Sequence, residues 1–323
     1  MKMQNTVGAI ETANAVIIGN SFSEALVADW LAFNADKKPA TVMTYGKAIK
    51  NFFGWLSDNG IKNPCRNDVI SYREKLCFSK KISTARLYLS AVKVFSKWLA
   101  SKGLYSDFAV GVGTPKLDEE SEIHSREALS LDEAKTALKT FEGKTDIKNL
   151  RDKIIMRLML NCALRTIEVV RLDTTDIERR HGKIFLRIWG KGRAGKTARV
   201  EISKTVYDMI LDYLNRRNAK FKAGEPMFTS TANRNRGQRL QTQSISRLAK
   251  RVFREIGIDS AFITCHSCRH FAATQMLLEG VDIAKVQKIL RHKNSSTTQI
   301  YRHDITANSN DGVQVLSDLL DAA

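Results

Sequence analysis

The sequence predicts a mainly α-helical protein with a small antiparallel β-sheet in its second half. Between residues 21 and 105, apolar side chains recur every three or four positions, which is the period of amphipathic helices. Further along, the β-rich runs KIFLRIW (183–189) and TARVEI (197–202) stand on either side of a Gly/Lys-rich turn. The two runs therefore predict a hairpin within a domain whose other segments have helical patterns.

Four helices are expected in a first domain, residues 21–106. The first should turn inward an apolar face formed by Leu26, Trp30 and Phe33. The second should be capped by Thr41 and end at Gly60, because glycine suits the left-handed position that follows a helix. A shorter third helix can be capped by Asn67 or Asp68.

The fourth helix of this domain should follow Ser83 and stop at Gly103. Its inward-facing side chains are expected to be Leu87, Ala91, Val94, Phe95 and Trp98. The polar faces of the helices carry basic side chains, namely Lys47, Lys50, Lys80, Lys81, Arg86, Lys93, Lys97 and Lys102. The first domain is thus expected to be a compact helical module with one basic side.

Composition separates this domain from the rest of the chain. Residues 1–20 are expected to form a flexible N-terminal segment. Residues 107–125 hold two glycines, a proline and an acidic run without helical periodicity, and are expected to be a linker. A second domain, residues 126–323, should open at Ser130-Leu-Asp-Glu133, a capping-box pattern, and stay helical to about Arg171.

The charge balance indicates a polyanionic partner. The chain has 52 lysine and arginine residues against 34 aspartate and glutamate residues, a net charge of +18. Between Arg179 and Lys222, 13 basic residues stand against 3 acidic ones. This excess favours nucleic acid over anionic lipid, because no basic amphipathic helix with a Trp/Leu face stands out. No apolar run approaches the ~18–20 residues of a membrane span, and no signal peptide is recognised, so a cytoplasmic protein is expected.

Residues 265–303 concentrate four of the six histidines and two of the five cysteines. The pair Cys265-x-x-Cys268 has the spacing of zinc ligands, and a histidine could complete such a site. A second ligand pair is missing, however, and FAATQMLL, which begins at Phe271, has the pattern of a buried helix. The two cysteines are therefore interpreted as small buried hydrophobic residues, and no metal or other cofactor is expected.

The same stretch favours a catalytic centre. The motif His266-x-x-Arg269 should head one helix, and the next helix should end just before His292. A further short helix would carry Tyr301. The chain then returns on itself, so that Arg269, His292 and Tyr301 can converge.

Two more features lie upstream of this stretch. Arg165 and Glu168 are one helical turn apart, and Lys191 stands between two glycines at the mouth of the predicted hairpin. In their order and spacing, Arg, Lys, His-x-x-Arg, His and Tyr resemble the tyrosine recombinases, or phage-integrase family, which includes the bacterial Xer proteins. The resemblance covers nearly the whole chain. It implies a helical, SAM-like core-binding domain followed by an α+β catalytic domain that ends in a C-terminal helix.

The resemblance also implies a set of site residues, namely Arg165, Lys191, His266, Arg269, His292, Tyr301 and Glu168. In this family two arginines clamp the scissile phosphate, the tyrosine is the nucleophile, and an acidic residue supports the first arginine. By comparison, His270 is expected to be structural.

The sequence departs from the family pattern at a few positions. Ala163 and Arg291 stand where glycine is usual, Cys268 replaces a leucine, and Glu201 stands where proline is frequent. The hairpin is also longer than is common in the family. The longer turn leaves Lys196 as an alternative to the hairpin lysine.

These residue types suit phosphodiester cleavage. Two guanidinium groups can meet the non-bridging oxygens of the transition state with paired hydrogen bonds, and they stay charged at any pH. His266 can accept the phenolic proton of Tyr301, and Lys191 can protonate the departing 5′ oxygen. The resemblance implies a 3′-phosphotyrosyl intermediate that stores the bond energy, so that neither a metal ion nor ATP is required.

The leading hypothesis is a site-specific recombinase that integrates and excises a mobile element or resolves DNA dimers. The alternatives are a DNA-binding or architectural protein and a type IB topoisomerase-like enzyme. The resemblance implies a double-stranded recombination site as partner, a monomer in solution, and a homo-tetramer on synapsed DNA whose C-terminal helices dock on neighbouring protomers. The resemblance is compatible with an accessory directionality protein as a further partner. It also implies that the protein is associated with the nucleoid.

Overall fold

The computed structural model describes residues 24–116, 128–189 and 195–292 of the 323-residue chain. The chain forms two compact units, residues 1–119 and 120–323, whose boundary lies within the segment expected to be a linker. Among the described residues, no helix combines the length and the apolar character needed to cross a bilayer.

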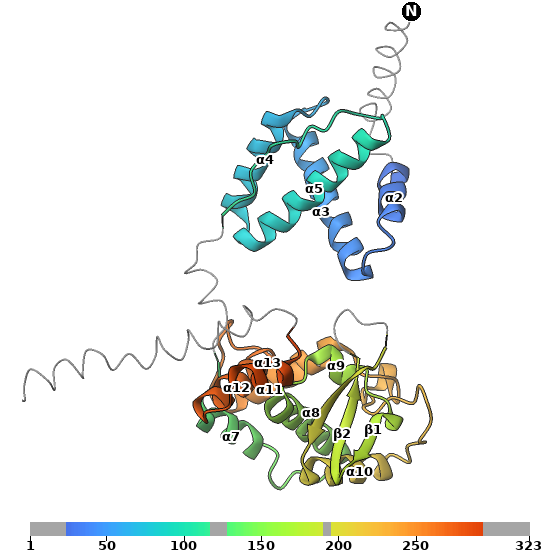
Figure 1. The fold of residues 1–323 in the computed structure, drawn as a ribbon, viewed down its shortest axis with the longest axis vertical. Helices are drawn as coiled ribbons and strands as arrows, with labels where there is room; N and C mark the ends of the chain where they lie inside the picture. Colours follow the sequence, from blue (N-terminus) through green and yellow to red (C-terminus); the bar gives the residue numbers. More distant parts are fainter. Residues whose placement is uncertain (1–23, 117–127, 190–194, 293–323) are drawn as a thin grey trace, which may run out of the picture. The chain divides into compact units, whose positions relative to one another are not determined.

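The first unit contains four described helices, as predicted (Figure 1). They are α2 (Glu24–Phe33), α3 (Pro39–Asp58), α4 (Arg66–Ser79) and α5 (Ile82–Ser101). Aromatic side chains from all four meet in one core: the rings of Phe52 and Tyr72 lie 4.9 Å apart, and those of Trp30 and Phe95 lie 5.3 Å apart. Edge-to-face contacts of this kind add stability beyond simple apolar burial. The basic side chains predicted on the polar faces are all at least partly exposed.

The predicted starts of three helices in this unit are wrong. Helix α5, which was expected to follow Ser83, begins at Ile82. Helix α3 begins at Pro39, because the fixed φ of proline suits a first turn, and Thr41 therefore lies inside the helix. Helix α4 has Cys65 as its N-cap residue. Asp68 stands at the third helical position instead, where its Oδ2 accepts a hydrogen bond of 2.7 Å from the backbone N–H of Cys65.

Two side chains predicted to face inward are exposed. Leu87 is 40% exposed because the buried face of α5 contains Leu89, and residues two apart on a helix point in nearly opposite directions. Phe33 is 61% exposed at the end of α2, although its ring still contacts that of Trp98 at 6.3 Å. Periodicity therefore located the helices better than it located the edges of their buried faces.

The first part of the predicted linker belongs to the core of the first unit. Phe108, Ala109 and Val112 are buried, and the ring of Phe108 stacks on that of Phe52 at 6.1 Å. Ser96 donates a hydrogen bond of 2.6 Å to Asp107, which holds the start of this segment against α5. The run FAVGV is apolar enough to pack although it lacks a helical period.

The second unit combines seven described α-helices with a small sheet, and so confirms the predicted fold class. The helices are α7 (Leu131–Lys139), α8 (Ile147–Cys162), α9 (Thr166–Val170), α10 (Lys204–Arg216), α11 (Thr242–Glu255), α12 (Ser267–Leu278) and α13 (Ile283–Leu290). The strands are β1 (Ile177–Arg180), β2 (Lys183–Ile188) and β3 (Ala198–Ile202), paired antiparallel in the order β1-β2-β3. The predicted hairpin is β2–β3. Strand β1 was missed because IERR is short and mostly charged.

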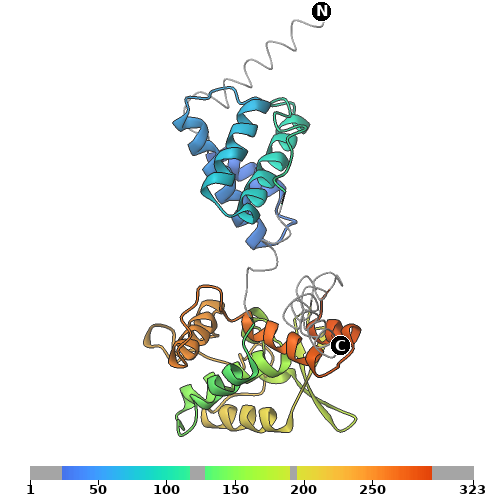
Figure 2. The ribbon, with the colours of Figure 1, turned by 90° about the vertical axis from the view of Figure 1, so that its left-hand side faces the viewer.

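Helix α8 forms the centre of this unit. It contacts α7 and α12, and it also contacts α10 and β3, so it lies between the sheet and the C-terminal helices (Figures 1 and 2). Of the side chains from Ile154 to Leu160, all except that of Arg157 are buried. The predicted capping box opens α7: Ser130 Oγ accepts from Glu133 N at 3.1 Å, and the Glu133 carboxylate accepts from Ser130 N at 2.7 Å.

Candidate active site

The ends of α8 and α13 and the start of α12 meet at one place in the second unit. A small apolar cluster joins them, made of Ala163, Ala272, Ala273, Val286 and Leu290. Close packing of these short side chains brings the polar residues next to them into contact. The candidate site is built on this junction.

Arg269 lies at the centre of the junction. It stands in the first turn of α12, is 4% exposed, and donates a hydrogen bond of 2.5 Å to the carbonyl of Ala163. Its other terminal nitrogen donates to the carbonyl of Leu290. Carbonyl groups at a helix C-terminus lack intrahelical partners and carry partial negative charge. The guanidinium is therefore held between the C-terminal ends of α8 and α13.

Arg165 and Glu168 form an ion pair beside this junction. Arg165 Nη1 lies 2.9 Å from Glu168 Oε1, and the backbone N–H of Arg165 donates to Glu168 Oε2 at 2.8 Å. The Glu168 side chain is completely buried. Burial alone raises the pKa of Glu168, but the charges of Arg291 and Arg165 and the backbone hydrogen bond outweigh it. The net effect holds the pKa of Glu168 below its usual range, so the carboxylate stays ionised.

A third arginine, Arg291, also contacts Glu168, although it was not among the residues predicted for the site. Its Nη2 lies 2.8 Å from Glu168 Oε2 and donates to the carbonyl of Ala163 at 3.1 Å. Ala163 and Arg291 both adopt positive φ, of 51° and 57°. This is the left-handed conformation that glycine adopts most readily, which explains why glycine is usual at both positions. The sequence signal that could have identified Arg291 as a site residue is that an arginine stands where the family usually has glycine.

His292 follows Arg291 and lies among the arginines. Its pKa is lowered to about 4, first by burial and then by the charges of Arg269, Arg165 and Arg291, with a smaller contribution from His270. The imidazole is therefore neutral at pH 7. In that form it offers one N–H donor and one acceptor nitrogen.

His266 immediately precedes α12, and its backbone N–H donates to Thr264 Oγ1 at 3.3 Å. It is partly exposed, whereas Cys268, two positions later, is buried in the core of the unit. Cys265 lies 3.6 Å from the hydroxyl of Ser246. In the described part of the chain, no group of three or more His, Cys, Asp and Glu side chains could hold a metal ion.

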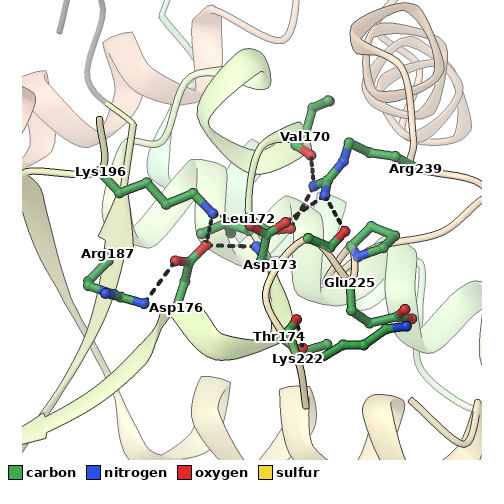
Figure 3. A network of polar contacts seen from close by, with 12 residues as sticks. Val170, Leu172, Asp173, Thr174, Asp176, Arg187, Lys196, Lys222, Glu225 and Arg239 are labelled. Carbon is green, nitrogen blue, oxygen red and sulfur yellow. Dashed lines mark hydrogen bonds and ion pairs between the residues drawn. The ribbon is translucent and has the colours of Figure 1, made fainter. Parts of the chain in front are cut away.

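Lys191 and Tyr301 lie outside the described residues, but the alternative lysine is described. Lys196 Nζ lies 2.6 Å from Asp173 Oδ2 and is also paired with Asp176 (Figure 3). Arg239 contacts the other oxygen of Asp173 at 2.5 Å, and Arg187 lies 3.6 Å from Asp176. This network ties the hairpin to the segment after α9. Two carboxylates engage the Lys196 ammonium, so an anchoring role fits it better than proton donation.

Two family models match the chain. The model of the phage integrase family matches residues 127–307, and that of the phage integrase N-terminal SAM-like domain matches residues 30–103. Between them they cover both units.

Curated relatives carry recombinase names. Tyrosine recombinase XerA of Pyrococcus horikoshii is 36% identical over 166 residues, which are 51% of this chain and 55% of that protein. Tyrosine recombinase XerD of Listeria innocua is 28% identical over 290 residues, which are 86% of this chain and 93% of that protein. The more identical match thus spans about half of its relative, and the other spans nearly all of it.

Solved structures share the fold at low identity. XerH recombinase bound to palindromic difH substrate, a post-cleavage complex, has a TM-score of 0.74 at 15% identity and covers 98% of this chain and 90% of that one. A lambda integrase tetramer bound to a Holliday junction has a TM-score of 0.61 at 16% identity. The match covers 91% of this chain and 82% of that one. At these identities the likeness concerns the fold.

Proposed function

The chain belongs to the phage integrase family, and from this premise we propose that it is a site-specific tyrosine recombinase. It would cleave a DNA strand, hold the 3′ phosphate on Tyr301, and rejoin it to the 5′ hydroxyl of another strand. The strongest support is that Arg291 joins Arg165 and Arg269, which are 104 residues apart in the sequence. Arg291 donates to the Ala163 carbonyl that Arg269 also binds, and it pairs with the Glu168 carboxylate that Arg165 also binds.

The described residues suit a phosphate-binding site. Arg269 binds the carbonyl of Ala163, Arg165 follows that carbonyl by two residues, and the charges of both arginines act on His292. We therefore expect both guanidinium groups to contact one phosphate. Preorganised donors of this kind stabilise the charge that develops on the non-bridging oxygens in the transition state. A neutral His292 would add a further hydrogen bond without losing a proton. Tyr301 would attack, with His266 as proton acceptor and Lys191 as the acid for the leaving oxygen.

A suicide substrate tests this function directly. A duplex nicked next to the cleavage position releases a short fragment after attack, so the covalent complex accumulates. The wild-type protein should yield a protein–DNA adduct joined through a 3′ phosphate, with or without EDTA. If the protein binds this duplex tightly and yields no adduct, the recombinase function fails and a DNA-binding or architectural role replaces it.

The partners follow from the same premise. We propose a double-stranded recombination site as the substrate and a tetramer as the synaptic assembly, formed in the cytoplasm where the nucleoid lies. The curated relatives XerA and XerD are named tyrosine recombinases, and this reaction serves both proposed roles, integration or excision of a mobile element and resolution of DNA dimers. The genes that flank this one would distinguish the two roles.

We expect DNA affinity to fall steeply with salt. The helices of the first unit and the segment between Arg179 and Lys222 are rich in lysine and arginine, which release counterions when they meet phosphates. With ~8 phosphate contacts, log K should fall against log salt with a slope of about −7. Fluorescence anisotropy with a random-sequence duplex at several salt concentrations measures this slope. A nearly flat response would contradict an electrostatic DNA clamp.

We expect Lys191 and Lys196 to respond differently to a sulfur leaving group. A substrate whose 5′ bridging oxygen is replaced by sulfur needs no proton at that atom, so it should restore much of the cleavage lost in Lys191→Ala. Lys196→Ala should lose activity through a loosened hairpin, because Lys196 pairs with Asp173 and Asp176, and sulfur should not restore it. Single-turnover cleavage of both substrates gives the comparison. Equal rescue of Lys196→Ala would assign the acid to Lys196.

A further inference from the structure

Glu168 has two arginine partners rather than one. Its Oε1 is bonded to Arg165 Nη1 at 2.9 Å, and its Oε2 to Arg291 Nη2 at 2.8 Å. We propose that Arg291 is a positioning residue for DNA cleavage. By occupying one oxygen of Glu168, it limits the side-chain contact of Arg165 to the other oxygen and leaves the rest of that guanidinium for the scissile phosphate. The inference rests on the proposed recombinase function.

The hydrogen bonds explain why the second arginine matters. A carboxylate that faces a single arginine tends to form two parallel bonds with it, and this uses an entire edge of the guanidinium. Here Glu168 Oε2 already accepts from the backbone N–H of Arg165 and from Arg291. The Arg165 side chain makes one hydrogen bond with the described residues, through Nη1. Its Nε and Nη2 donors are then available to a phosphate.

The charges at the site support the same conclusion. Glu168 is completely buried, and one arginine would leave the pair electrically neutral. Arg291 restores a surplus of positive charge, and its side chain is only 10% exposed, so solvent screens it weakly. The charge of Arg291, together with those of Arg269 and Arg165, lowers the pKa of His292. A phosphodiester that enters the site would therefore be attracted by a net positive charge.

The backbone of Arg291 indicates that stability alone does not explain this residue. Its φ of 57° is unfavourable for a residue that has a Cβ atom, and glycine would adopt it without strain. Among the described residues, its buried Nε also has no hydrogen-bond partner. Strain of this kind persists where surrounding contacts enforce it, and it is frequent at functional sites.

The test replaces Arg291 with glycine, which relieves the strain and removes both contacts. We expect the single-turnover cleavage rate to fall roughly 10- to 100-fold, a range typical of coupled neighbouring residues, with little change in DNA affinity or melting temperature. The control is Asn218→Gly, which introduces glycine at another position of positive φ, 51° after α10, and should cleave like wild type. Arg291→Asn, which also tolerates this conformation, should repeat the loss.

A second substitution separates positioning from a structural role. In the otherwise wild-type protein, Glu168→Gln should slow cleavage, because it weakens the hold on Arg165. In the Arg291→Gly protein the same change should instead restore part of the rate, because it removes a carboxylate that would now pair with Arg165 through both oxygens. If Arg291 has only a structural role, the loss of cleavage rate in Arg291→Gly and the loss in Glu168→Gln should add in the double variant.

The outcomes are distinct. Absence of the adduct with wild type overturns the proposed function itself. An adduct with wild type, together with unchanged cleavage by Arg291→Gly or with accumulating losses in the double variant, overturns the role of Arg291 alone.

Discussion

Replacing Tyr301 with phenylalanine is expected to abolish covalent attachment of the protein to DNA while leaving DNA binding nearly unchanged. The substitution removes one oxygen, the proposed nucleophile, and keeps the aromatic ring. No other group in a phenylalanine side chain can attack phosphorus. The suicide duplex, resolved on a denaturing gel, should show an adduct with wild type and none with Tyr301→Phe, with or without EDTA.

The matched control is Tyr207→Phe. This tyrosine belongs to α10, where its hydroxyl accepts a hydrogen bond of 3.0 Å from Arg179 and its ring lies 5.0 Å from that guanidinium. Losing this hydroxyl should leave adduct formation close to wild type. If Tyr301→Phe still forms the adduct, the nucleophile is another residue and the assignment of the site fails.

Replacing Arg269 with alanine should have the second-largest effect, and it should reduce both cleavage and stability. Cleavage should fall by about 10²–10³ or more, because preorganised donors to the transition state are removed. Stability should fall by about 1–3 kcal/mol, because the buried carbonyls of Ala163 and Leu290 lose a charged donor. Single-turnover adduct formation and thermal unfolding measure the two effects.

Arg165→Ala provides the comparison. Cleavage should fall by a similar factor, about 10²–10³, whereas the loss of stability should be smaller, because Arg291 still pairs with the buried Glu168 carboxylate. The exposed Arg216, paired with Asp212 on α10, is the control for a nonspecific loss of positive charge, and Arg216→Ala should change neither property much. Full cleavage by Arg269→Ala would exclude that arginine from the phosphate site.

The sequence alone was sufficient for most of the local structure and for the family. Helical periodicity located α2 to α5, the capping box at Ser130 located the start of α7, and the β-rich runs located β2 and β3. These signals lie within a few residues of each other, so they do not depend on the rest of the fold. The spacing of the His-x-x-Arg motif and its neighbours indicated the family in the same way.

The tertiary structure decided the contacts between distant segments. Arg269 reaches the carbonyl of Ala163, 106 positions earlier, because a small apolar cluster packs the ends of α8 and α13 against α12. The pairing of Arg291 with Glu168 and of Lys196 with Asp173 likewise joins segments whose sequences carry no sign of one another. Local patterns encode which residues can form a helix or a cap. Which charges share a buried carboxylate depends on how those helices pack, and that is determined only when the whole core is assembled.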